Sequence, residues 1–260
     1  MVEYARKGLI GLLTPQANTT VEPEFCILML PGYAFLNARL VSDKPTIEAR
    51  LGDYFARMAA TTDEFANAPV GAYAFACTGA SYLEGRTREE GEVKRIEDAR
   101  GRPFITAGQA VAEALHLLGA ARIGLVSPYP SGLTEASIDY WRSHGFDIAT
   151  VANAFNAGSD FHPIYSLGAD AATSALGQAS ESSVDAIVML GTGMPTLGPI
   201  LAKAPRPTMP VLSCMTALAW RSLAVFEPEL RQSTAARDYL AGVPWRSRYT
   251  IFIGQPAKYN

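Results

Sequence analysis

The two halves of the chain repeat one pattern of apolar segments and turn residues. Three pairs of segments carry the repeat: IGLLTP at 10–15 with IGLVSP at 123–128, AFACTG at 74–79 with MLGTGM at 189–194, and PFIT at 103–106 with PVLS at 210–213. Self-similarity of this kind indicates a duplicated structural unit. The middle pair differs in chemistry, because Cys77 in the first copy is replaced by Thr192 in the second. A cleft between two such units would be symmetric in shape and carry a thiol on one side only.

Short apolar runs alternate with longer segments of helical periodicity in both halves, which is typical of parallel α/β units. The expected strands span 8–14, 37–42, 71–76, 103–107, 122–127, 146–152, 185–190 and 210–213, and the expected helices span 20–30, 46–63, 86–99, 108–118, 134–144, 163–179, 196–203 and 214–224. We therefore predict an α/β fold of two pseudo-symmetric, doubly wound lobes with parallel sheets. Ligands bind beyond the carboxyl ends of strands in such sheets, so we expect the active site at the lobe interface.

Turn residues and the repeat set the expected domain boundaries. The first lobe spans residues 1–118 and the second spans 119–247. Gly119 and Gly145 fall where helices are expected to end in a left-handed residue. The apolar segment 248–253 reads as a ninth strand that returns to the first lobe, because it needs a sheet to cover it.

Composition excludes several classes of function. The net charge of −3 is spread without a dense Lys/Arg run, which argues against nucleic acid as a partner. Nowhere is there an apolar stretch near the ~20 residues that a membrane span requires, and the N-terminal apolar run is too short for a signal peptide. Three irregularly spaced cysteines suit reduced thiols. We expect a soluble, cytoplasmic protein. No metal-ligand spacing, dinucleotide fingerprint or phosphate loop is found, so we predict no metal and no cofactor.

The three cysteines differ in their surroundings. Cys77 follows an apolar strand and precedes Thr78 and Gly79, whose backbone N–H groups in a tight turn would favour a reactive thiolate. The alternative is a buried small hydrophobe, the usual place of a free cysteine. Cys26 lies in an apolar helical run and reads as core. Cys214 starts a helix, where Ala107 is its counterpart, and remains a minor candidate. If Cys77 is activated, iodoacetamide should modify it faster than Cys26.

Other polar residues follow expected strands. Asn18, with Thr19 and Thr20, comes after Pro15 and either caps the next helix or helps to bind a carboxylate. Tyr129 occupies the equivalent point of the second lobe between two prolines. Asn156, in a Gly/Ser/Asp-rich loop, is either a turn former or a ligand donor. His116 and His144 read as surface or helix-end residues, and His162 is ambiguous, so the histidines form no catalytic triad.

These residues resemble the aspartate/glutamate racemase superfamily, and within it the branch that holds maleate cis-trans isomerases and arylmalonate decarboxylases. The resemblance covers almost the whole chain. It is carried by GLLTPQANTTVE at 11–22, ACT at 76–78, SPY at 127–129 and the segment 210–220. It implies cofactor-independent chemistry at the α-carbon of a small mono- or dicarboxylate. Family members are commonly oligomers, so a homo-oligomer is open.

The resemblance also implies roles for individual residues. Cys77 matches the first catalytic cysteine, Asn18 and Tyr129 match carboxylate binders, as does Asn156 less securely, and Thr78 and Gly193 match oxyanion donors. Pro15 and Gly79 complete the expected substrate-binding set. Thr192 stands where a racemase has its second cysteine, and a hydroxyl is a poor acid or base near neutral pH, although it can donate to an oxyanion.

Three functions stay open on these grounds. The first is a dicarboxylate isomerase with Cys77 as nucleophile or acid/base. The second is an arylmalonate-type decarboxylase with Cys77 as the proton donor. The third is a non-catalytic carboxylate-binding protein built on the same scaffold.

Overall fold

The computed structural model describes residues 2–155, 163–203 and 209–254 and has two four-stranded parallel sheets. The first sheet has the order β2-β1-β3-β4, with β1 at Gly8–Pro15, β2 at Tyr33–Leu40, β3 at Ala72–Phe75 and β4 at Phe104–Thr106. The second has the order β6-β5-β7-β8, with β5 at Arg122–Ser127, β6 at Asp147–Asn153, β7 at Ala186–Met189 and β8 at Val211–Ser213. The matching strand orders confirm the predicted pseudo-symmetric α/β fold.

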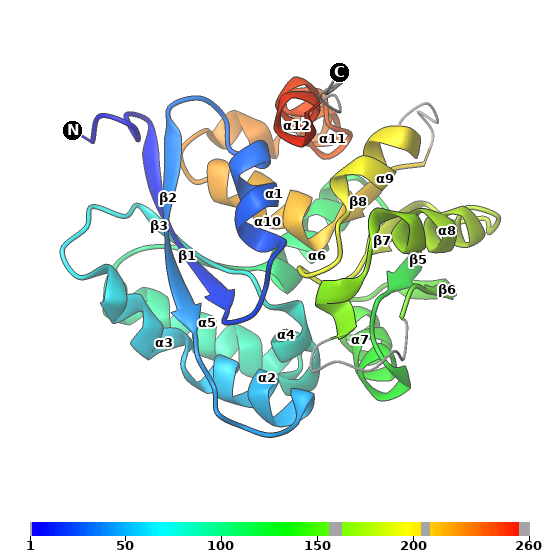
Figure 1. Cartoon of the computed structure of the whole chain (residues 1–260), viewed down its shortest axis with the longest axis horizontal. Coiled ribbons are helices and arrows are strands. Elements are labelled where there is room, and N and C mark those ends of the chain that lie inside the picture. Colours follow the sequence, from blue (N-terminus) through cyan, green and yellow to red (C-terminus); the bar gives the residue numbers. More distant parts are fainter. Residues whose placement is uncertain (1, 156–162, 204–208, 255–260) are drawn as a thin grey trace, which may run out of the picture.

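Helices cover both sheets (Figure 1). In the first half they are α1 (Val21–Leu28), α2 (Ile47–Ala56), α3 (Met58–Thr61), α4 (Thr78–Glu84), α5 (Arg86–Arg100) and α6 (Ala107–Leu117). In the second half they are α7 (Ser131–Ser143), α8 (Ala169–Ala179), α9 (Leu197–Lys203), α10 (Cys214–Leu223), α11 (Ser233–Leu240) and α12 (Arg246–Ile253). Short 3-10 turns lie at Thr62–Phe65 in the first half and at Pro163–Ser166 and Pro228–Arg231 in the second. None of the described helices is long and apolar enough to cross a membrane.

The two halves contact each other through helices, one from the first half and one from the second in each pair. The equivalent helices α6 and α10 pack against each other, as do α1 with α10 and α4 with α7 (Figure 1). An ion pair joins Glu113 of α6 to Arg221 of α10, with 2.6 Å between the carboxylate and Nε. One continuous set of buried apolar residues runs through both halves. The carboxyl ends of the two sheets are thereby held against each other.

Most boundaries of the expected elements agree with the structure within a few residues, but α4 and α11 were not expected and two expected helices differ. The expected helix 46–63 is divided into α2, α3 and a 3-10 turn, and the expected helix 163–179 starts as helix only at Ala169. Gly119 and Gly145 have φ values of +72° and +91°, which confirms that left-handed residues follow α6 and α7.

The prediction of a ninth strand at 248–253 is wrong. Residues 248–253 belong to α12, which packs on α1 and α9 instead of pairing with a sheet (Figure 1). Buried Trp245 precedes the helix, and Arg248 donates from Nε to the Ile27 carbonyl at 2.7 Å. These tertiary contacts outweigh the strand preference of the β-branched and aromatic residues, since that preference depends strongly on context.

Candidate active site

A cleft lies where the carboxyl ends of the two sheets face each other. It has a volume of about 510 Å³, including the part open to solvent. Eight of the nine residues predicted for the site line it: Pro15, Asn18, Cys77, Thr78, Gly79, Tyr129, Thr192 and Gly193. The ninth, Asn156, lies outside the described residues, as does His162.

Strand register explains why these residues meet. In the first sheet Leu13 pairs with Phe75, and two further residues along each strand lead to Pro15 and Cys77. In the second sheet Val126 pairs with Met189, and three further residues lead to Tyr129 and Thr192. Neighbouring parallel strands therefore deliver one pair of site residues from each half to the same edge.

Cys77 is the thiol on the cleft wall. It precedes the first residue of α4 and is only 4% exposed. The Ala80 amide donates to its sulfur and favours the thiolate, but burial has the larger effect and raises the pKa of the Cys77 thiol to about 12. The backbone amide acts in the expected direction, but burial outweighs it, so the prediction of a reactive thiolate is wrong. The thiol keeps its proton at neutral pH.

Thr192 occupies the position across from Cys77 in the repeat, and its hydroxyl is engaged in the fold. Thr192 Oγ1 donates to the carbonyl of Ala76 at 2.8 Å and accepts from Asn18 Nδ2 at 3.3 Å. A hydroxyl has one proton to donate, so the donation to Ala76 competes with donation to a substrate oxyanion. Through these two hydrogen bonds Thr192 of the second half links to Ala76 and Asn18 of the first.

Asn18 precedes Thr20, the N-cap residue of α1, and its side chain accepts amides at the start of that helix, the first of the two uses predicted for it. Its Oδ1 accepts the amides of Thr20 and Val21 at 2.9 and 3.0 Å. Its Nδ2 carries two hydrogens, of which one points to Thr192. Asn18 is buried, lines the cleft and is held rigidly by these contacts. The second Nδ2 hydrogen makes no hydrogen bond within the described part of the chain.

Tyr129 and Thr78 join the two halves on the other side of the cleft. The Tyr129 hydroxyl lies 3.1 Å from Thr78 Oγ1. Burial raises the pKa of Tyr129 well above its usual value, so the phenol is neutral and can donate a hydrogen bond. Cys214 is fully buried behind this pair, and burial raises the pKa of its thiol to about 11. The helix start does not make Cys214 a reactive thiolate.

Of the expectations about residues away from the cleft, that for Cys26 is wrong and that for His144 is confirmed only in its helix-end position. Cys26 is exposed rather than core, because it points away from the buried face of α1 that carries Phe25 and Leu28. His144 follows α7, but it is 9% exposed and packs on the Tyr140 ring. Burial lowers the pKa of His144 to about 4 and outweighs the helix end. His116 is exposed, as expected.

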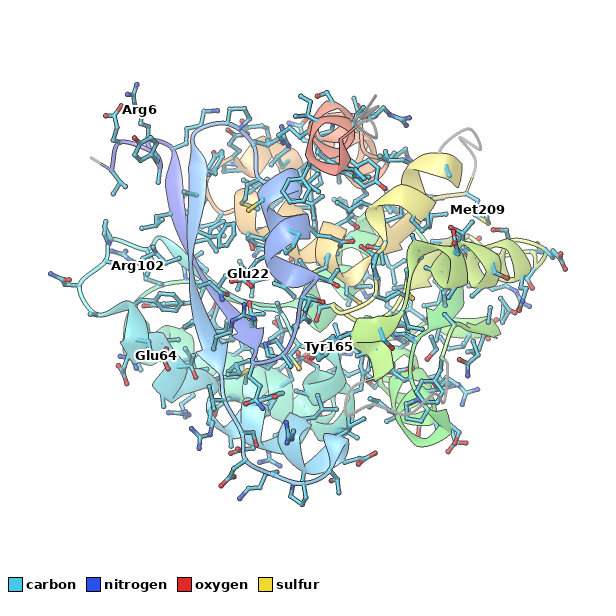
Figure 2. All side chains as sticks on the ribbon, in the orientation of Figure 1. Arg6, Glu22, Glu64, Arg102, Tyr165 and Met209 are labelled. Atoms are coloured by element: carbon cyan, nitrogen blue, oxygen red, sulfur yellow. The ribbon has the colours of Figure 1, made fainter. Side chains whose placement is uncertain are left out.

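The cleft also has an apolar side that the sequence analysis missed. Its members are Ile47, Leu51, Leu133, Phe155 and Ile164, with the ring of Tyr165. Ile47 and Leu51 are four residues apart on α2, so the helical period of that segment was a usable signal. Figure 2 shows Tyr165 near the centre of the view, between the ribbons of the two halves. No spacing in the sequence pointed to Tyr165.

Two arginines of the first half, Arg39 and Arg50, lie near Tyr165, although neither is among the residues that line the cleft. Burial raises the pKa of Tyr165, and Arg39 and Arg50 act in the opposite direction, so both guanidinium groups lie close enough to influence its hydroxyl. Arg39 pairs with Glu22 and also donates from Nη1 to the carbonyls of Pro15 and Asn18 at 3.3 and 3.2 Å. These charges would favour an anionic ligand.

Comparisons with known proteins agree with this architecture. The model of the arylmalonate decarboxylase family matches residues 10–238. A maleate isomerase of Nocardia farcinica is 30% identical over 229 residues, which cover 82% of this chain and 88% of that protein. A maleate isomerase of Pseudomonas putida is 31% identical over 150 residues, or 54% of this chain, and the match spans only 60% of that relative's length.

Solved structures show the same fold. A maleate isomerase from Pseudomonas putida superposes with a TM-score of 0.76 at 23% identity, covering 85% of this chain and 93% of that one. A Nocardia farcinica maleate cis-trans isomerase mutant with a covalently bound succinylcysteine intermediate gives 0.72 at 26% identity, with coverage of 85% and 93%. Arylmalonate decarboxylase gives 0.67 at 18% identity, with coverage of 84% and 92%. With the family model spanning both sheets and the cleft between them, the chain belongs to the arylmalonate decarboxylase family.

Proposed function

We propose that this protein is a cofactor-independent isomerase of a small cis-dicarboxylate and that Cys77 adds to the double bond. The observation that carries the proposal is a single thiol on the wall of a cleft with hydrogen-bonding groups from both halves. The maleate isomerases among the relatives support the substrate class. The succinylcysteine intermediate of the Nocardia farcinica enzyme supports covalent chemistry at a cysteine.

The reaction balances with one thiol. The Cys77 sulfur bonds to one alkene carbon while its proton passes to the adjacent carbon, which gives a succinyl-type thioether. Rotation about the new carbon–carbon single bond brings the carboxylates to opposite sides. The other hydrogen of that adjacent carbon, now next to sulfur, passes to sulfur as a proton while the sulfur–carbon bond breaks, and the trans acid leaves. We assign Asn18 and Tyr129 as carboxylate donors, and Thr78 and Gly193 as donors to the developing enediolate.

A second candidate is decarboxylation of a substituted malonate, and two observations favour it. The apolar side of the cleft suits an apolar substituent, and the raised pKa of Cys77 keeps on sulfur the proton that such a reaction must deliver. Carbon dioxide leaves with cleavage of a carbon–carbon bond, and the enediolate takes the thiol proton at carbon. Water then restores the proton to sulfur.

Product analysis separates these functions. The purified protein is incubated with maleate and with an arylmalonate, and NMR follows the trans acid while carbon dioxide release is measured. A trans acid without carbon dioxide supports the isomerase, and carbon dioxide without an alkene product supports the decarboxylase. Cys77→Ala should abolish either activity, with a loss of about 10²–10⁴-fold expected for removing an acid/base group alone. The matched control is Cys26→Ser, an exposed thiol away from the cleft.

Turnover that survives in Cys77→Ala would contradict both mechanisms. If neither acid reacts but both bind equally to the wild-type protein and Cys77→Ala, the carboxylate-binding alternative replaces them.

The homo-oligomer implied by the family resemblance stays a prediction, and sedimentation of the purified protein tests it.

A further inference from the structure

Glu24 is a buried carboxylate that the reaction does not use. It lies on α1 and is 6% exposed, with no cation among its hydrogen-bond partners in the described residues. Leaving a carboxylate in such a place is costly unless its oxygens accept hydrogen bonds. The hydrogen bonds of Glu24 therefore indicate which segment this side chain holds in place.

All of its partners lie in the other half of the molecule. Glu24 Oε1 accepts the amide of Thr196 at 2.7 Å and, more weakly, that of Leu197 at 3.4 Å. Thr196 Oγ1 lies 3.1 Å from Oε2 and 2.9 Å from Ser213 Oγ at the end of β8. The carboxylate therefore fixes the start of α9, directly after the loop that carries Thr192 and Gly193.

Residues just before α1 hold the earlier part of that loop, at Thr192 and Gly193. Thr20, one helical turn before Glu24, donates from Oγ1 to the Gly193 carbonyl at 2.8 Å. Asn18 donates to Thr192, whose hydroxyl reaches the Ala76 carbonyl next to Cys77. The loop 190–197 is thus held at three successive points by residues that precede or form α1. Glu24 makes the most C-terminal of these attachments.

We propose that Glu24 is a positioning residue for the reaction, holding the loop 190–197 so that Thr192 and Gly193 stay at a fixed distance from Cys77. This inference rests on the proposed function only in taking Cys77 and this loop as the two walls at which chemistry occurs. Misplacing groups around a reacting centre by about 1 Å can cost about 10²-fold in rate, so the attachment has kinetic consequences.

The surroundings of Glu24 provide a readout other than stability. Burial raises the pKa of Glu24 to about 7, against the hydrogen bonds from Thr196 and Leu197. Across from it, the Tyr249 phenol of α12 lines the adjoining cavity, and Glu24 acts on its pKa. Arg248 of α12 donates instead to the carbonyls of Ile27 and Leu28, and Glu22 on the same helix pairs with Arg39. The Glu24 contacts should therefore change strength near neutral pH.

Two substitutions separate positioning from general stability. Glu24→Gln keeps an oxygen for the two amides and places an N–H where a protonated carboxyl would donate to Thr196 Oγ1, so it mimics the protonated form. We expect it to keep activity close to the wild-type value below pH 7 and to lose any step in kcat near pH 7. Glu24→Ala should lower kcat by about 10²-fold, with a smaller change in KM.

Glu113→Gln is the matched control. Glu113 also makes a carboxylate contact between the halves, to Arg221 and Arg231, but it touches no residue of the cleft. We expect this variant to keep the wild-type kcat and pH profile. A Glu24→Gln variant that retains the step near pH 7, or a folded Glu24→Ala variant with the wild-type kcat, overturns the proposal.

Amide hydrogen exchange keeps the test independent of the substrate. Glu24→Ala should speed exchange at Thr196 and Leu197, and Glu113→Gln should not. If the wild-type protein turns over none of the acids tested, the proposed function fails while exchange still decides whether Glu24 holds the loop. Unchanged exchange in a folded Glu24→Ala protein contradicts the positioning role, whichever reaction the protein catalyses.

Discussion

The reactivity of Cys77 toward iodoacetamide tests the electrostatics of the cleft directly. Burial raises the pKa of this thiol from 9.0 to about 12. The thiolate is the nucleophile, so this rise in pKa lowers the fraction of Cys77 present as thiolate at pH 7 by about 1000-fold. Each thiolate becomes more nucleophilic as its pKa rises, with a Brønsted slope of about 0.4–0.5, which restores about 20-fold. The net expectation is a rate about 50-fold below that of an ordinary thiol.

Cys26 provides the comparison within the same molecule. It is exposed, although burial and Glu22 raise its pKa to some extent. We expect iodoacetamide to modify Cys26 first at pH 7, the reverse of the order expected from the sequence. Mass spectrometry of timed samples gives both rates, and unfolded protein, in which both thiols are accessible, serves as the control. The Cys77 rate should rise about tenfold for each pH unit up to pH 10, as for any thiol well below its pKa. Faster labelling of Cys77 than of Cys26 at pH 7 would refute the reasoning, because it requires a stabilised thiolate.

Three further predictions concern stability, each measured by urea unfolding. His144 has a folded-state pKa of about 4, so the free energy by which the wild-type protein exceeds His144→Gln should fall by about 3 kcal/mol as pH falls from 6.5 to 4. Glu24 acts in the opposite direction, because its folded-state pKa is about 7. Its contribution to the free energy of unfolding is fully present below pH 4.5, and about 3 kcal/mol is lost as pH rises from 4.5 through 7. A Glu24→Gln protein that shows the same fall would contradict this pKa. Thr192→Val should cost about 1 kcal/mol through loss of the hydrogen bond to Ala76, and Thr192→Ser should recover it; equal stability of the two variants would exclude that bond as a tie.

The repeat predicted the fold and most of the cleft for a physical reason. Parallel strands in register bring their carboxyl ends to one edge, so residues at equivalent points of two copies must converge when the copies face each other. Pro15 and Cys77 follow neighbouring strands of one sheet, and Tyr129 and Thr192 follow neighbouring strands of the other. Local sequence was sufficient because each residue is placed by its own strand.

The errors occur where tertiary contacts decide. The segment 248–253 has strand-forming residues, but α12 is fixed by contacts to α1 and α9 that no local pattern contains. Cys26 is an error of another kind, because the helical period around Phe25 and Leu28 places it outward and the apolar neighbours in the sequence outweighed that local signal in the prediction. The raised pKa of Cys77 follows from how completely the two halves enclose it, which depends on residues far along the chain such as Tyr165.

The change from a thiol to a hydroxyl between the two copies has two consequences that reinforce each other. Thr192 removes the second acid/base group from the cleft, and its hydroxyl ties its loop to the carbonyl beside Cys77. A thiol is a weaker hydrogen-bond donor, so a cysteine there would hold that carbonyl less well. In the reactions proposed above, proton transfer is then confined to the face of the substrate that meets Cys77. If the reaction creates a stereocentre, a single proton donor held on one side by a fixed loop must give one enantiomer, whereas racemization needs an acid on each side.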